Sequence, residues 1–172
     1  ENDLREYRTP SAIVQGHLGL ARFVRRRGGA EADITVIVGY APQEPNVGDA
    51  KANAKVGAFW DELYTCIISL PTRTKLHLML DANGHTGKTK TTSGEETLMA
   101  ESFPTVIGDA YNETTNLNGY MLIQLAHATG LTIINTFPRF RHGCGPTHAN
   151  GHRLDYFPTE EQRAQEVEQC TV

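Results

Sequence analysis

An acidic residue and an amide follow directly after a short apolar run in the middle of the chain. The run at residues 76–80 leads into Asp81, and Asn83 and His85 follow at alternate positions. On an extended backbone, alternate side chains point to the same side. The carboxylate would then act as a base or metal ligand and the amide as a hydrogen-bonding clamp on a phosphate. Phosphodiester hydrolysis assisted by Mg²⁺ or Mn²⁺ uses such groups, so this chemistry is one interpretation of Asp81 and Asn83. An Asx turn after a strand is the simpler structural explanation of the same pattern.

Residues 82–89 also match the looser form of the Walker A pattern, a small residue followed after four positions by Gly-Lys-Thr. In such a phosphate-binding loop, a helix begins at the Lys-Thr pair and points its amide groups at the phosphates. Thr and Gly dominate the residues that follow here, and both are weak helix formers. Binding of a nucleotide by a P-loop therefore stays open as a less favoured alternative.

Periodicity predicts the elements that must position these residues. Residues 18–24 and 34–40 are predicted to be two strands of a hairpin, because the first segment alternates, the second is a run of β-branched residues, and Gly28 and Gly29 lie between them. Residues 50–69 show the spacing of an amphipathic helix that ends before Pro71. The apolar face of this helix is expected to consist of Val56, Phe59, Trp60, Leu63 and Ile67. A strand–helix–strand unit of this kind places the strands at 34–40 and 76–81 parallel in one sheet.

The second half of the chain is predicted with fewer regular elements. After Gly87 we expect a polar loop, then a helix at residues 117–129 that stops at Gly130. Strands are expected at 131–135 and 153–157. We therefore expect one domain over residues 1–158 and a polar, acidic tail over residues 159–172.

Composition narrows the class of protein. The 172 residues carry a formal net charge of -4, which argues against a protein that coats nucleic acid by bulk electrostatics. Three cysteines, an odd number, favour free thiols in a reducing, intracellular compartment. No apolar run has the roughly 18 residues needed to span a bilayer, so no membrane partner is expected. The first residue is Glu, and we expect a piece of a longer polyprotein.

Four segments carry a family resemblance in order along the chain: residues 36–44 (VIVGYAPQE), 78–87 (LMLDANGHTG), 116–136 and 152–157 (HRLDYF). The chain resembles the endonuclease/exonuclease/phosphatase superfamily, which includes apurinic endonucleases. The third segment looks particularly like the endonuclease domains of non-LTR retrotransposons. The resemblance implies an α/β fold, a partial four-layer, DNase I-like sandwich of two mainly antiparallel sheets with outer helices. It also implies DNA as the substrate and the nucleus as one candidate location.

The resemblance also implies roles for individual residues. Tyr40 would contact the scissile phosphate or the incoming nucleophile, and Asp81 would position and deprotonate a water. Asn83 would hold the phosphate and help at the metal, Asp155 would orient a catalytic histidine, and His85 would be a contact on the substrate side. Tyr40 could instead be an ordinary aromatic residue at a strand end, and Asp155 a partner of an arginine. Two further matching residues, Asn116 and Asn118, are expected to be structural helix caps.

Two parts of the family pattern have no counterpart in this chain. No Gln-Glu motif carrying the main metal-binding glutamate precedes residue 11, and no Ser-Asp-His motif follows residue 158. The chain therefore resembles the middle and later portion of the domain, and part of one sheet should lie open. We expect weak metal binding and slow or no hydrolysis by this chain alone. A degenerate module that only binds nucleic acid or a protein remains an alternative.

Two other groups of residues could bind ligands. His142, Cys144, His148 and His152 have spacings permissible for zinc, although the glycines between them favour an irregular loop. A set of arginines could follow a phosphate backbone or simply be solvated at a hairpin turn. These are Arg22, Arg25, Arg26, Arg27, Arg139 and Arg141.

Overall fold

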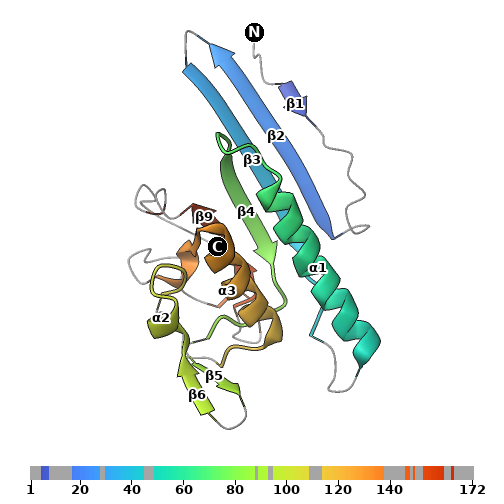
Figure 1. Cartoon of the computed structure of the whole chain (residues 1–172), viewed down its shortest axis with the longest axis vertical. Helices are drawn as coiled ribbons and strands as arrows, with labels where there is room; N and C mark the ends of the chain where they lie inside the picture. The colour runs from blue at the N-terminus through green and yellow to red at the C-terminus, as the bar shows by residue number, and fades with distance from the viewer. Residues whose placement is uncertain are drawn as a thin grey trace.

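The computed structural model describes eleven stretches of the chain: residues 5–7, 17–27, 30–44, 49–87, 89–92, 95–108, 114–137, 146–147, 149, 153–160 and 164. Within these stretches the protein is a mixed α/β structure (Figure 1). Its strands are β1 (Arg5–Tyr7), β2 (Leu18–Arg27), β3 (Ala30–Tyr40), β4 (Lys75–Asp81), β5 (Thr89–Thr92), β6 (Glu95–Leu98), β7 (Leu131–Ile133), β8 (Asp155–Tyr156) and β9 (Pro158–Glu160). Its helices are α1 (Ala50–Ile68), α2 (Met99–Ser102), α3 (Leu117–Thr129) and the 3₁₀ turn η1 (Ile134–Thr136).

A mixed sheet forms the frame of the described structure. Its strand order is β1-β2-β3-β4-β9-β7, and β8 also pairs with β4. β2 and β3 form the predicted antiparallel hairpin, and β3 and β4 are parallel, as the strand–helix–strand pattern predicts. The remaining pairs in this sheet are antiparallel.

Helices α1 and α3 lie side by side on one face of this sheet (Figure 1). The apolar side chains of β3 and β4 that point toward them form one core with both helices. The predicted inner face of α1 is confirmed, since all five of its expected residues are buried. Helix α3 begins and ends where the sequence predicts, with Asn116 as its N-cap and Gly130 in the left-handed conformation (φ 67°) as its stop.

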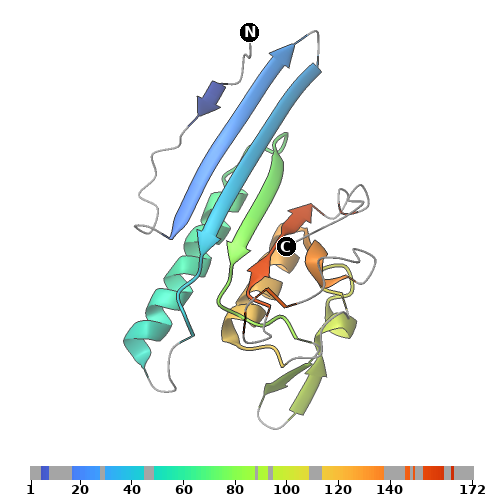
Figure 2. The same cartoon turned by 180° about the vertical axis from the view of Figure 1, so that it is seen from behind.

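The opposite face of the sheet carries no helix in the described structure (Figure 2). Apolar and aromatic side chains at the carboxyl ends of the two central strands are exposed there. Val38 and Tyr40 of β3 are 53% and 47% exposed, and Met79 of β4 is 44% exposed.

Three predicted segments differ from the structure. The strand expected at 131–135 ends at Ile133, where the 3₁₀ turn η1 follows. The expected polar loop after Gly87 contains the hairpin β5–β6, whose first strand is rich in the β-branched residue Thr. The strand expected at 153–157 is instead the short pair β8 and β9, and β9 lies between β4 and β7. The predicted boundary between residues 158 and 159 therefore falls inside β9. Pro158 is the first residue of β9, a position in a strand where proline is tolerated. Ala164, in the predicted tail, is also buried.

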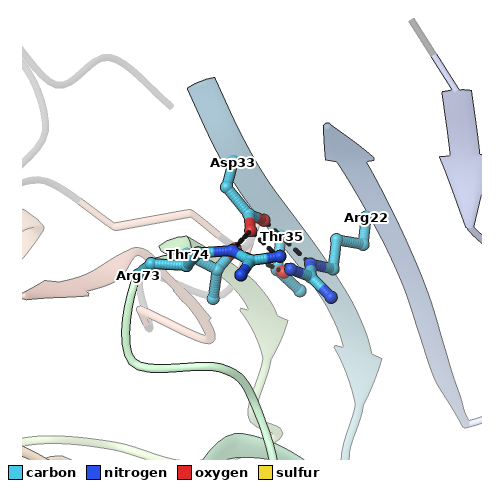
Figure 3. A network of polar contacts seen from close by, with 5 residues as sticks. All are labelled: Arg22, Asp33, Thr35, Arg73 and Thr74. Carbon is cyan, nitrogen blue, oxygen red and sulfur yellow. Dashed lines mark hydrogen bonds and ion pairs between the residues drawn. The ribbon is translucent and has the colours of Figure 1, made fainter. Parts of the chain in front are cut away.

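A network of polar contacts lies at the amino ends of β3 and β4 (Figure 3). The buried carboxylate of Asp33 accepts hydrogen bonds from two arginines, two from Arg22 on β2 and one of 2.8 Å from Nε of Arg73. Beside it, the hydroxyl groups of Thr35 and Thr74 lie 2.8 Å apart in a hydrogen bond. The hydrogen bonds from Arg22 hold the pKa of Asp33 well below its usual range, although burial opposes them; Arg73 and Thr74 also lower it. This network joins β2, β3 and the turn before β4.

Within the described residues, no helix is both long enough and apolar enough to cross a membrane.

Candidate active site at the carboxyl ends of β3 and β4

Four side chains that can take part in acid–base chemistry occupy neighbouring positions across the carboxyl ends of the central strands. Tyr40 on β3 is in register with Asp81 on β4, and Asp81 is in register with Asp155 on β8. His17, just before β2, lies on the other side of Tyr40, whose backbone N–H donates to its carbonyl oxygen at 2.8 Å. We call His17, Tyr40, Asp81 and Asp155 the edge row. They come from four segments of the chain, and only the sheet brings them together.

The edge row lines a pocket of about 580 Å³. The pocket lies on the face of the sheet away from α1 and α3, where Val38 and Met79 supply an apolar floor. Its remaining lining residues are Leu18, Gly19, Gly39, Leu80, Tyr156 and Phe157. A pocket with an apolar floor and a few converging polar groups is the usual form of a small binding site.

The backbone turns sharply after Asp81, and this corrects one prediction. The N–H of Asn83 donates to Oδ1 of Asp81 at 3.0 Å, and Asn83 has a φ of 45°. This is an Asx turn with a left-handed residue, so the extended backbone expected between Asp81 and Asn83 is wrong. The two side chains are therefore not on one side of a strand, since β4 ends at Asp81.

Neither Asn83 nor His85 lines the pocket with the edge row. The amide nitrogen of Asn83 donates to the carbonyl oxygen of Ala41 at 2.7 Å, which fastens the end of β4 to the end of β3. The backbone of His85 is held at both its N–H and its carbonyl by Asn116. The structure brings together three of the predicted site residues, Tyr40, Asp81 and Asp155, and leaves these two beside them.

Asn116 and Asn118 clamp the loop that follows Asp81. Asn116 is the N-cap of α3 as predicted, whereas Asn118 lies within the first turn of α3 and is not a cap. Oδ1 of Asn116 accepts hydrogen bonds from the N–H groups of Gly119 (3.0 Å) and His85 (2.8 Å). Asn118 is fully buried, and its Oδ1 accepts from the indole N–H of Trp60 at 3.0 Å. Its amide nitrogen donates to two carbonyl oxygens, of Pro42 at 2.8 Å and of Asn83 at 3.3 Å. One side chain thus joins α1, α3 and the ends of β3 and β4.

Two glycines let this loop approach the start of α3. A Cβ atom on Gly119 would lie 1.9 Å from the carbonyl oxygen of His85, and one on Gly84 would lie 2.6 Å from Cβ of Asn118. No side chain fits at either contact. The glycines of the Asn-x-Asn-Gly and Asp-x-Asn-Gly segments are therefore two sides of one packing contact.

A tyrosine ties the same loop to the last strands. The hydroxyl group of buried Tyr156 accepts a hydrogen bond from the N–H of Thr86 at 3.0 Å. It also lies 2.9 Å from the carbonyl oxygens of Gly84 and Arg153. This contact fixes β8, and with it Asp155, relative to the loop after β4.

The backbone of Asp155 is held from two further sides. Oγ1 of Thr147 accepts from its N–H at 3.1 Å, and the amide of Asn135 donates to its carbonyl oxygen at 2.8 Å. The side chain of Asp155 makes no hydrogen bond or ion pair within the described part of the chain. Its carboxylate is thus positioned by its backbone.

Asp81 and Asp155 are the two carboxylates of the edge row. Directly opposite residues of an antiparallel pair have Cβ atoms about 4.5–5.5 Å apart on the same face, and like charges there repel. A cation between two carboxylates removes this repulsion, and carboxylate oxygens are the ligands that Mg²⁺ and Mn²⁺ prefer. No group of three or more His, Cys, Asp or Glu side chains suitable for a metal occurs among the residues that the structure describes.

The helix that a P-loop needs does not follow the Walker-like segment. The chain is described again from Thr89, where strand β5 begins. Without a helix, no row of amide groups and no helix dipole faces a phosphate at this place.

Among the other predicted ligand residues, the structure describes the side chain of Arg22. Arg22 belongs to the Asp33 network at the opposite end of the strands, so its predicted role in following a phosphate backbone is not favoured. Cys66 on α1 is a free cysteine, and burial and the nearby charge of Glu62 raise the pKa of its thiol. The predicted zinc residues, the other two cysteines, the side chains of Arg25, Arg26 and Arg27, and Arg139 and Arg141 lie outside the described residues.

Sequence reasoning did not find His17. Its place beside Tyr40 depends on the register of β2 and β3, in which Leu18 pairs with Gly39.

Compared with models of known protein families, the chain matches none, and a comparison with curated proteins finds no similar sequence.

Proposed function

We propose that this chain carries the catalytic half of a metal-dependent phosphodiesterase site, with DNA as the substrate class. One observation carries the proposal. Tyr40, Asp81 and Asp155, which the family resemblance singles out, are 41 and 74 positions apart in sequence (81 minus 40, and 155 minus 81). They nevertheless occupy adjacent register positions on three strands and line one pocket.

Three residues of the edge row, Tyr40, Asp81 and Asp155, have a chemical task in this proposal. Asp81 and Asp155 would hold Mg²⁺ or Mn²⁺, which supplies a bound water of lowered pKa and neutralises charge on the phosphate. Asp81 accepts the proton of the attacking water, and the half-exposed hydroxyl group of Tyr40 donates to a phosphate oxygen. Asn83 acts indirectly, because its bond to Ala41 keeps the ends of β3 and β4 together.

The proposal extends to the complete fold of the domain and to the longer protein that would contain it. A DNase I-like sandwich would pack a second sheet against the open face of this sheet and leave the edge row at the rim between the two sheets. We propose that the missing partner segments belong to a longer retroelement polyprotein that acts on DNA in the nucleus. The chain by itself would then bind Mg²⁺ weakly and hydrolyse slowly or not at all.

The test is nicking of supercoiled and abasic plasmid DNA with Mg²⁺ by the unsubstituted chain and by Asp81→Ala. Asp61→Ala, which removes an exposed carboxylate from α1, is the matched control. We expect slow nicking that Asp61→Ala retains and Asp81→Ala loses. Equal nicking by all three proteins would contradict the proposal.

A second readout does not depend on turnover. Mg²⁺ that binds the folded protein raises its melting temperature. We expect this rise in the unsubstituted chain and in Asp61→Ala and its loss in Asp81→Ala. DNA binding that is independent of Mg²⁺ and of Asp81 would favour the degenerate binding module, and stabilisation by ATP would favour the P-loop.

A further inference from the structure

His17 has a fixed orientation at the end of the edge row. Its Nδ1 lies 3.0 Å from the carbonyl oxygen of Tyr40, and its own carbonyl accepts from the N–H of Tyr40 at 2.8 Å. Its ring also packs near the ring of Tyr40, with a centroid distance of 6.2 Å and an angle of 33° between the planes. Backbone and side chain are therefore both held against Tyr40.

This contact determines which nitrogen of His17 carries a hydrogen. A carbonyl oxygen only accepts hydrogen bonds, so Nδ1 must be the donor. The other nitrogen, Nε2, is then the one that gains or loses a proton. A histidine oriented by a backbone carbonyl through Nδ1–H is a recurring arrangement for proton transfer through Nε2.

The order of the edge row separates His17 from the two carboxylates. Neighbouring strands lie about 4.8 Å apart, so the backbones of His17 and Asp81, two strands apart, are separated by about 10 Å. Tyr40 lies between them. A phosphodiester bound at Tyr40 would present one side to Asp81 and Asp155 and the other side to the imidazole. In phosphoryl transfer, the attacking and leaving oxygens lie on opposite sides of phosphorus.

We infer that His17 is the general acid that protonates the leaving oxygen, an inference that rests on the proposed function. A water oxygen forms a bond to phosphorus and gives its proton to Asp81. The bond from phosphorus to the leaving oxygen breaks, and that oxygen takes the proton from Nε2 of His17. The neutral imidazole keeps its Nδ1–H on Tyr40 and regains a proton from solvent.

The leaving group provides a test of this role. An alkoxide leaving group, as in a thymidine dinucleotide, needs a proton, whereas p-nitrophenolate in thymidine 5′-(p-nitrophenyl phosphate) is stable without one. For His17→Gln we expect a loss of about 100-fold or more in kcat on the dinucleotide, with little change on the nitrophenyl ester and little change in KM. His77→Gln is the control, because His77 is exposed on β4 and does not line the pocket.

A spectroscopic readout keeps the inference testable when turnover is slow. Nitrogen-15 NMR of the imidazoles should show hydrogen on Nδ1 of His17. Inorganic phosphate with Mg²⁺ should shift Nε2 of His17 and leave His77 unchanged, and Asp81→Asn should abolish the shift. Each of these results supports the inference.

The outcomes separate this inference from the proposed function. Equal loss on both esters in His17→Gln, or no response of Nε2 to phosphate, overturns the role of His17. The proposed function stands in that case, provided that Mg²⁺ still stabilises the chain through Asp81. When Asp81→Asn leaves both hydrolysis and stabilisation by Mg²⁺ unchanged, the proposed function fails as well.

Discussion

The two ends of the β3–β4 pair both carry buried or half-buried carboxylates, but they use them differently. At the amino end, Asp33 is buried and receives hydrogen bonds from two guanidinium groups (Figure 3). At the carboxyl end, Asp81 and Asp155 lie opposite each other and face a pocket. The first arrangement pairs one carboxylate with two arginines. The second brings two carboxylates into direct register.

This difference separates a structural carboxylate from a candidate functional one. A paired and buried charge contributes to stability, because removal of either partner leaves the other without compensation. Two like charges in direct register cost stability unless a cation binds them, and proteins accept such costs mainly at functional sites. Substitutions at the two ends should therefore change stability in opposite directions.

The largest effect is expected at the amino end. Asp33→Ala should lower the free energy of unfolding by about 3 kcal/mol, near the low end for a broken buried ion pair, because the Arg22 side chain keeps 20% exposure. Arg73→Ala should cost less, since 57% of that side chain is exposed. Urea unfolding at pH 7 measures both. An Asp33→Ala protein as stable as the unsubstituted chain would show that this network is not structural.

The next largest effect on stability is expected at Gly119, where α3 packs against the loop that follows Asp81. Gly119→Ala should cost about 2 kcal/mol, because the new Cβ would overlap the carbonyl oxygen of His85 and push the loop after Asp81 away from α3. Gly57→Ala is the matched control, since a Cβ there meets nothing within 4 Å. It should instead stabilise α1 by about 0.5–1 kcal/mol. Thermal unfolding of the two variants should therefore shift in opposite directions.

Low pH should reduce the contribution of Asp33 to the free energy of unfolding. The pKa of Asp33 is lowered in the folded protein, whereas an unfolded aspartate has a pKa of about 3.9. The stabilisation by Asp33 is therefore fully present above about pH 5 and is lost as the pH falls from about 4 toward the lowered folded pKa. The measurement is the difference in unfolding free energy between the unsubstituted chain and Asp33→Asn. This difference should shrink below pH 4, and a constant difference from pH 7 to pH 3 would contradict the assignment.

The smallest effect is expected at Asp155. Asp155→Asn removes one of two like charges in register, so without divalent cations it should leave stability unchanged or raise it by up to about 0.5 kcal/mol. With Mg²⁺ present, the unsubstituted chain should gain stability and the variant should gain less. Chemical unfolding in EDTA and in Mg²⁺ checks both statements. A loss of more than 1 kcal/mol in EDTA would place Asp155 among the structural carboxylates.

Regular elements were predictable wherever a pattern was local and long enough. The five buried positions of α1 recur at helical spacing, and Asn116 and Gly130 mark the two ends of α3. The parallel pairing of β3 and β4 followed from the helix between them. The short strands β5, β6, β8 and β9 have two to four residues each, too few to show a period.

The sequence by itself determined that Asp81 follows an apolar strand, and the resemblance of four segments to a known family added Tyr40 and Asp155 as candidates. Only the tertiary structure decided which of them meet. Register brought His17 into the edge row, and an Asx turn took Asn83 out of it. The tertiary structure also placed Asp33 between two arginines from different segments of the chain. The physical reason is that local patterns report burial and backbone preference, whereas strand register and side-chain pairing depend on partners distant in the sequence.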